Sequence, residues 1–165
     1  MFRIGLGQDS HKIKCKMQNA KCKIDKPLIL GGVLVDENIE VIADSDGDII
    51  LHSLFNAFSS AIGEKPLGFY ATPLCKKGIT DSKVFLQIIL DKIKEKGFKI
   101  ENVAITIEAS KPRFENILEK IRSSLAKILK ISKDQVGLSP TSGDFLTSFG
   151  KGEGIQVFSI ILLSK

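Results

Sequence analysis

The last apolar run of the chain, IQVFSIILL at residues 155–163, restricts the fold more than any other segment. It is too short to cross a bilayer as a helix, as is every other apolar run in the sequence. Read as a strand, it is apolar on both faces, so both faces must be covered. One layer of helices covers only one face of a sheet. We therefore expect helices on one face of this strand and another subunit on the other.

Strand-like and helix-like patterns alternate along the rest of the chain. Apolar residues at helical spacing predict three helices, at about 49–62, 81–96 and 112–130. Further strands are predicted at about 2–7, 27–35, 99–109 and from 134, while 64–80 is interpreted as a loop. This order predicts an α/β (α+β layered) fold in which a mixed sheet carries helices on one face. At 165 residues, the chain is predicted to form one domain over 1–165.

The chain has only two histidines, and each lies close to acidic residues. Asp9 and His11 are two residues apart in an extended segment, so their side chains point the same way. His52 lies on the first predicted helix, four residues after Asp48, which is positioned to orient the imidazole ring. One carboxylate and two imidazoles suit zinc with an open fourth position, as in catalytic sites. On spacing alone, histidines packed into the core remain an alternative. Ser45 and Asp48 also predict a capping box at the start of this helix.

Two short segments have the composition of phosphate-binding loops. In SPTSGD (139–144), Thr141 and Ser142 offer hydroxyls, and a glycine lets backbone amides approach an anion closely. In ASKPRF (109–114), Lys111 and Arg113 are predicted at the N-terminus of the third helix, where the dipole also favours phosphate. Asp144 is a candidate ligand for a second, hard divalent cation bridging phosphates. Ordinary turns remain the alternative for both segments.

The net charge of +5 comes from one segment. Residues 10–26 hold six lysines and one acid, whereas the rest of the chain is balanced. No aromatic residue is interleaved to stack on bases, so a solvated lysine-rich hairpin or loop at about 12–26 is favoured over a nucleic-acid surface. Three irregularly spaced cysteines predict reduced thiols. With no secretory signal pattern at the start, we expect a cytoplasmic location without membrane partners.

Several motifs occur together and in a characteristic order. They are RIGLGQDSHK, LILGGV, DSDGDIILHSL, NVAITIEASKPR and TSGD followed by GKGEGIQV. Together they resemble the 2-C-methyl-D-erythritol 2,4-cyclodiphosphate synthase family of the non-mevalonate isoprenoid pathway. The resemblance runs from Phe2 to near the C-terminus. It implies a homotrimer around a threefold axis, with active sites between subunits. The implied reaction cyclises 4-diphosphocytidyl-2-C-methyl-D-erythritol 2-phosphate and releases CMP.

The resemblance also implies roles by position. Asp9, His11 and His52 match zinc ligands, and Asp144 matches a ligand of the magnesium or manganese ion that bridges the diphosphate. Ser142 stands where a threonine stabilises the transition state, and Asp44 stands where a histidine usually does so. The charged pair at the mouth of a central apolar channel corresponds to Lys151 and Glu153. The matched substrate-binding residues are Ser10, Ser45, Gly68, Ala109, Lys111, Pro112, Arg113, Pro140, Thr141, Ser142 and Lys151.

The departures from the family pattern cluster around the sugar-alcohol pocket. The usual Asp-Ile-Gly, whose aspartate holds the erythritol hydroxyls, is replaced by Pro66-Leu67-Gly68, and we expect Glu64 to substitute for it. Asn56 stands where an aspartate is common. Because the metal and nucleotide positions are retained, we expect the same reaction in a pocket with a different lining. A zinc-dependent nucleotidyl-diphosphate hydrolase is the alternative, and a basic nucleic-acid-binding module is the less favoured third reading.

Overall fold

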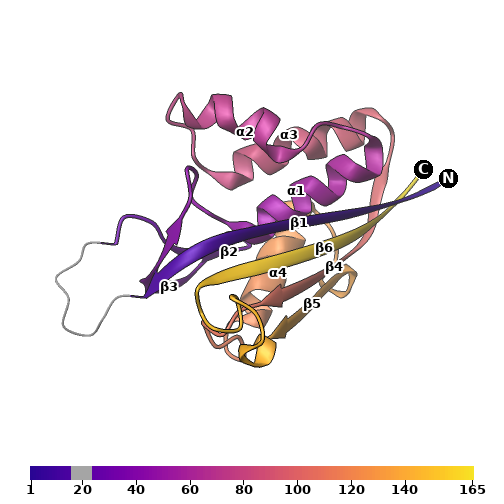
Figure 1. Cartoon of the computed structure of the whole chain (residues 1–165). Coiled ribbons are helices and arrows are strands. Elements are labelled where there is room, and N and C mark those ends of the chain that lie inside the picture. Colours follow the sequence, from indigo (N-terminus) through magenta and orange to yellow (C-terminus); the bar gives the residue numbers. More distant parts are fainter. Residues whose placement is uncertain (16–23) are drawn as a thin grey trace.

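The computed structural model describes residues 1–15 and 24–165, so the central part of the predicted lysine-rich segment lies outside the described residues. Six strands, four α-helices and two short 3-10 helices follow one another in these residues (Figure 1). They are β1 Phe2–Cys15, β2 Pro27–Leu30, β3 Val33–Ile42, α1 Ile49–Ile62, α2 Leu67–Cys75, α3 Ser82–Glu95, β4 Lys99–Glu108, α4 Leu118–Leu129, η1 Lys133–Gln135, β5 Val136–Thr141, η2 Gly143–Phe145 and β6 Gly154–Ser164.

The strands form one mixed sheet in the order β2-β3-β1-β6-β4-β5. All neighbours are antiparallel except β4 and β5, which are parallel. The long central pair β1 and β6 crosses the whole molecule (Figure 1). The register pairs Ser10 with Gln156, Gln156 with Glu108, and Glu108 with Thr141. The ends of β1, β4 and β5 that carry the predicted site residues therefore meet at one end of the sheet.

Helix α1 lies unusually close to β1, and two glycines make this possible. A Cβ added to Gly5 would lie 1.9 Å from the carbonyl oxygen of Ala57, and one added to Gly7 would lie 2.0 Å from that of Ser53. Only residues without a side chain fit beneath the helix at these positions. The alternating Gly-x-Gly of β1 thus brings α1 down onto the strand, on the same face from which Asp9 and His11 project.

The start of α1 corrects the predicted capping box. Asp48 is the N-cap, and its carboxylate accepts a hydrogen bond from the Leu51 N–H at 3.2 Å. It also accepts from the N–H groups of Gly31 and Gly32, at 2.9 and 2.6 Å. Ser45 lies three residues earlier and accepts from the Gly47 N–H. The residue that begins the helix therefore also fixes the turn between β2 and β3.

Two further helix predictions are corrected. The predicted loop 64–80 contains α2, which packs its buried Ala71 against the core despite the internal Pro73. The third predicted helix starts later than expected, since α4 begins at Leu118. Pro112 follows a cis peptide bond in the bend before it. Because α4 begins only at Leu118, Lys111 and Arg113 do not lie at a helix N-terminus.

The face of β1 and β6 away from α1 is apolar and open. Ile4 and Leu6 on β1 are 72% and 57% exposed, and Phe158 and Ile160 on β6 are 42% and 51% exposed. On the other face of β6, Val157 and Ile161 are fully buried. The prediction that β6 is apolar on both faces is confirmed, and in one chain only the helix-side face is covered. Among the described residues, no helix is long and apolar enough to cross a membrane.

Candidate active site

Asp9, His11 and His52 meet at the interface of β1 and α1. The Asp9 Oδ2 atom lies 2.8 Å from His52 Nδ1 and 3.4 Å from His11 Nε2, and the two imidazole nitrogens are 3.1 Å apart. Adjacent ligands of a tetrahedral zinc ion with nitrogen and oxygen ligands are about 3.3 Å apart. The three atoms are therefore spaced as the ligands of one divalent cation. Among the described residues, this is the one such cluster of histidine, cysteine and carboxylate side chains.

The protonation of the cluster suits cation binding. Burial lowers the pKa of His11 below its ordinary value of 6.5, although the Asp9 carboxylate acts in the opposite direction. At neutral pH His11 therefore offers a lone pair. His52 is buried and Asp9 is partly exposed, so the cluster is enclosed on the α1 side and open on the other.

Asp48 does not orient His52, contrary to the sequence prediction. Its carboxylate is fully buried and engaged by the backbone N–H groups of Gly31, Gly32 and Leu51. Burial raises the pKa of Asp48 to about 6, while these three N–H groups oppose the shift. Its role is to hold the turn and the helix start from which His52 projects.

A cleft of about 660 Å³ opens beside the three ligand atoms. Among the predicted site residues, Asp44, Ser45 and Gly68 line it, together with Asp9, His11 and His52. Helix α2 forms its opposite wall, which the loop-like sequence pattern of residues 64–80 does not indicate. The residues contributed by this wall are Pro66, Leu67, Gly68, Ala71, Thr72, Cys75 and Lys76.

Asn56 and Glu64 have structural partners of their own. Asn56 lines the cleft, where its side-chain oxygen accepts from the Leu67 N–H at 3.0 Å and so holds the start of α2. Glu64 does not line the cleft. Its carboxylate accepts from the Tyr70 hydroxyl at 2.9 Å and pairs with Lys92 at 3.4 Å. In one chain, Glu64 is therefore engaged with Tyr70 and Lys92 instead of lining this cleft.

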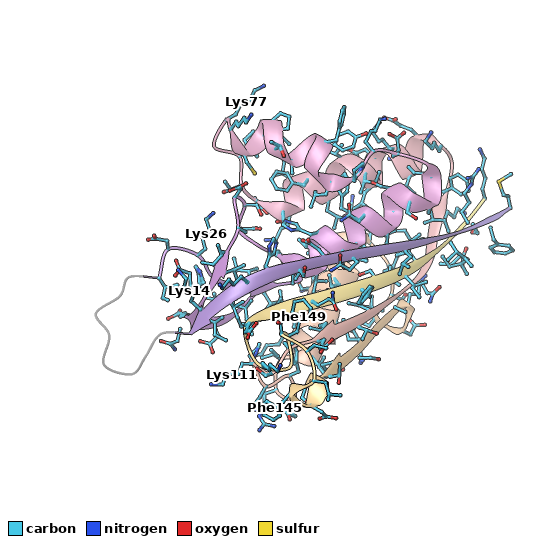
Figure 2. All side chains as sticks on the ribbon, viewed as in Figure 1. Lys14, Lys26, Lys77, Lys111, Phe145 and Phe149 are labelled. Atoms are coloured by element: carbon cyan, nitrogen blue, oxygen red, sulfur yellow. The ribbon has the colours of Figure 1, made fainter. Side chains whose placement is uncertain are left out.

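The two predicted phosphate loops form a second cleft, of about 420 Å³. It lies where β4 and β5 end side by side, and Figure 2 shows Lys111 and Phe145 at this corner of the molecule. Lys111 is exposed nearby but does not contribute to the lining. The predicted residues that line this cleft are Ala109, Pro112, Arg113, Pro140, Thr141 and Ser142.

The loop after β5 has an uncommon backbone. Gly143, Asp144 and Phe145 have φ values of 69°, 46° and 60°, and left-handed conformations are uncommon for residues with a side chain. The Ser142 hydroxyl donates to Asp144 Oδ1 at 3.0 Å, and the Asp144 carboxylate is exposed. The sequence contained a signal for this turn in its Ser-Gly-Asp triplet.

Ser10 and Lys151 lie away from both clefts. Ser10 and Glu153 line a third, smaller cleft of about 240 Å³ on the other side of His11. Lys151 is exposed in the loop before β6, and its backbone N–H donates to the Thr147 carbonyl. Within one chain, the sequence-predicted residues therefore fall into separate groups at the same end of the sheet.

Comparison with known proteins gives a consistent result. The sequence model described as the YgbB family matches residues 2–164. A curated relative from Chlamydia muridarum, named 2-C-methyl-D-erythritol 2,4-cyclodiphosphate synthase, is 39% identical over 98% of this chain and 87% of its own length. A Plasmodium falciparum structure described as IspF in complex with CDP is 33% identical, with a TM-score of 0.83 over 98% of this chain and 95% of that one. A synthase structure from Plasmodium vivax is 28% identical, with a TM-score of 0.82 over 100% and 99%.

Proposed function

The chain belongs to the YgbB family, and from this premise we propose that it is a 2-C-methyl-D-erythritol 2,4-cyclodiphosphate synthase, a lyase of the non-mevalonate route to isoprenoids. The substrate is 4-diphosphocytidyl-2-C-methyl-D-erythritol 2-phosphate. A 2-phosphate oxygen bonds to the β-phosphorus, the bond from that phosphorus to the bridging oxygen breaks, and CMP leaves with the oxygen. Residues 1–165 form a single catalytic domain in this proposal.

The observation that carries the proposal is the convergence of Asp9, His11 and His52 at the wall of the larger cleft. The donor set and its spacing fit zinc. When bound there, zinc supplies Lewis-acid stabilisation of charge on a phosphate oxygen. The chain's own contribution is to place these ligands in a part-buried wall, where electrostatic interactions are stronger than in water.

The second cleft is proposed to hold the cytidine nucleotide. The P. falciparum relative is described as a CDP complex, and this cleft contains the chain's matching residues. Arg113 and Lys111 provide positive charge for the phosphates, and the Thr141 hydroxyl donates to a phosphate oxygen. The Ser142 hydroxyl does the same by exchanging its hydrogen bond to Asp144 Oδ1 for one to the ligand. The exposed Asp144 carboxylate is the proposed ligand for magnesium or manganese.

Asp44 is proposed as a catalytic residue whose negative charge needs a neutralising partner near the substrate. It is exposed at the cleft that contains the triad, where a carboxylate repels phosphate unless a cation or donor neutralises it. Lys76 lines the same cleft and supplies positive charge there.

Because the attacking 2-phosphate and the diphosphate belong to one substrate molecule, positioning contributes most of the required rate enhancement.

We further propose that three chains pack their open apolar faces together around a threefold axis. The face formed by Ile4, Leu6, Phe158 and Ile160 is apolar and exposed in one chain. An exposed apolar patch of this kind marks a protein contact. Assembly also offers a way to bring the triad of one chain to the nucleotide cleft of its neighbour. Sedimentation equilibrium tests this proposal, since the expected mass is about three times the chain mass of 18.1 kDa.

Product analysis in ¹⁸O-labelled water tests the proposed reaction. The purified protein, supplied with zinc and magnesium, is incubated with the cytidine diphosphate substrate, and products are identified by ³¹P NMR and mass spectrometry. Cyclisation yields CMP and the cyclic diphosphate in equal amounts, with no ¹⁸O in either. A linear bisphosphate carrying ¹⁸O would instead assign the protein as a hydrolase.

A further inference from the structure

The side of His52 that faces away from Asp9 and His11 has its own buried partners. His52 Nε2 lies 2.8 Å from Ser82 Oγ and 3.3 Å from Ser45 Oγ. Ser82 is 1% exposed and is the first residue of α3, so it comes from a different part of the fold. Sequence reasoning did not identify Ser82, because it lies far from every recognised motif along the chain.

The carboxylate of Asp46 defines the direction of the hydrogen bond between Ser82 and His52. Its oxygens accept from the Ser82 backbone N–H at 3.0 Å, from the Asp48 N–H at 3.1 Å and from the Ser82 hydroxyl. A carboxylate only accepts, so the Ser82 hydroxyl proton points to Asp46. The Ser82 oxygen is then left with lone pairs toward His52, and the ring must donate from Nε2–H.

The hydrogen bonds therefore select one tautomer of His52. With its proton on Nε2, the ring presents a lone pair at Nδ1, toward Asp9 Oδ2 at 2.8 Å. Two acceptors at that distance repel each other unless a metal cation or a second ring proton lies between them. The same arrangement that satisfies the buried ring edge thus leaves the other edge ready for a metal ion.

The segments that carry the two residues are fixed to each other. The Asp46 backbone N–H donates to the Thr80 carbonyl at 2.9 Å, beside the Asp46–Ser82 hydrogen bonds. The loop before α1 and the start of α3 are therefore joined by backbone and side-chain hydrogen bonds. Such anchoring keeps the Ser82 oxygen in the position that the His52 ring requires.

We propose that Ser82 and Asp46 are positioning residues that hold His52 in its metal-binding tautomer, as a carboxylate–serine–histidine chain. This inference rests on the proposed metal site and adds residues to it that do not touch the ion. Outer partners of metal-bound histidines commonly contribute about 10–100-fold in metal affinity. The Ser82 hydroxyl is therefore expected to affect zinc affinity without being a ligand.

Zinc affinity, measured by competition with a chromophoric chelator, tests the inference on the full chain. Ser82→Ala is expected to weaken zinc binding by about 10–100-fold. Asp46→Asn offers an amide N–H to Ser82, which lets the serine donate to Nε2 and moves the ring proton to Nδ1, so it is also expected to weaken binding. The matched control is Ser53→Ala, because Ser53 is a buried serine of α1 whose hydroxyl contacts Ser159 and the Ile50 carbonyl. It should leave zinc affinity unchanged.

Two further measurements separate positioning from a structural role. Thermal unfolding of the zinc-free variants reports any loss of stability, which a purely structural role of Ser82 would produce without a change in zinc affinity. The ¹⁵N chemical shifts of the histidines in the zinc-free wild-type protein report the tautomer directly. A proton on Nε2 of His52 is expected, and a neutral ring protonated on Nδ1 would overturn the inference even if the variants fail to fold.

The outcomes also distinguish this inference from the proposed function. If the wild-type protein binds no zinc, the proposed metal site is wrong. If it binds zinc and Ser82→Ala binds it equally well, the site stands and the positioning role is overturned.

Discussion

The proposed metal triad and the proposed nucleotide cleft are built in opposite ways. The triad combines a strand and a helix that are pressed together at Gly5 and Gly7, and the ring of its buried His52 has partners on both edges. The second cleft is formed by exposed loops, with Arg113, Thr141 and Ser142 open to solvent. The first site is therefore organised before any ligand binds. The second presents groups that a ligand has to order on binding.

This difference indicates that the two regions have separate functions, one in metal binding and chemistry and the other in nucleotide affinity. Changes in the triad should affect metal binding and chemistry together, because its groups act as one unit. Changes in the loops should affect nucleotide affinity and leave the metal in place. The predictions below test this separation.

The largest effect is expected from His52→Ala. Loss of a direct ligand should weaken zinc binding by more than the roughly 100-fold expected for outer partners. Zinc content per chain and kcat/KM should fall together, as measured by elemental analysis and a coupled CMP assay. Lys77→Ala, on the exposed surface, is the control. Full zinc content in the His52 variant would contradict the assigned ligand set.

Gly7→Ala should separate the helix from the strand. The new Cβ would lie 2.0 Å from the Ser53 carbonyl oxygen, so backbone must move. We expect the free energy of unfolding to fall by about 1–3 kcal/mol or more, as for other overpacked cores, with weaker zinc binding. The control for stability is Gly68→Ala, since a Cβ there has no atom within 4 Å. It should be neutral or slightly stabilising in urea denaturation. Equal stability of the Gly7 variant and wild type would disprove the close-packing explanation.

Arg113→Ala should affect the other region alone. Loss of a charged hydrogen bond to phosphate is expected to weaken CDP binding by about tenfold, with a shallower salt dependence in calorimetric titrations. Zinc content should not change. Lys120→Ala, an exposed cation on α4, controls for general charge effects. If the Arg113 variant lost zinc, the two regions would not be independent.

The smallest effect concerns pH in the zinc-free protein. The pKa of His11 is lower in the folded state than its ordinary value of 6.5. Between the folded and the unfolded pKa, the unfolded chain binds more protons, so stability falls as pH is lowered. Asp48, with its pKa raised to about 6, acts in the opposite sense, since its contribution is lost as pH rises through about 6. Comparing wild type with His11→Gln cancels the Asp48 effect. Urea midpoints between about pH 5 and 7.5 should fall less steeply with acid in the variant. An identical pH dependence of the urea midpoint in wild type and variant would contradict the lowered pKa of His11.

Local rules predicted the groups that lie close along the chain. Alternation along β1 correctly placed Asp9 and His11 on one side, and β6 is apolar on both faces, as its sequence pattern predicted. Long-range contacts explain the failures. The Asp48 carboxylate accepts hydrogen bonds from the N–H groups of Gly31 and Gly32, which no local sequence pattern indicates. Helix α2 forms despite Gly68 and Pro73, because tertiary packing overrides local helix propensity. One such contact joins Tyr70 to Phe55, with ring centroids 5.6 Å apart.

Ser82 shows most clearly what the sequence could not reveal. Its neighbours Thr80 and Asp81 give an ordinary helix start, with Asp81 as the cap. Only the tertiary fold brings its hydroxyl to within 2.8 Å of His52. A residue proposed to position a metal ligand, but matching no sequence motif, can be found from the structure and not from the sequence pattern.

Anomalous diffraction at the zinc edge, from crystals grown with zinc and CDP, tests the central claim most directly. One peak per chain is expected, about 2.0–2.2 Å from Asp9 Oδ2, His11 Nε2 and His52 Nδ1. A peak bound by other residues, or none at these three atoms, would contradict it.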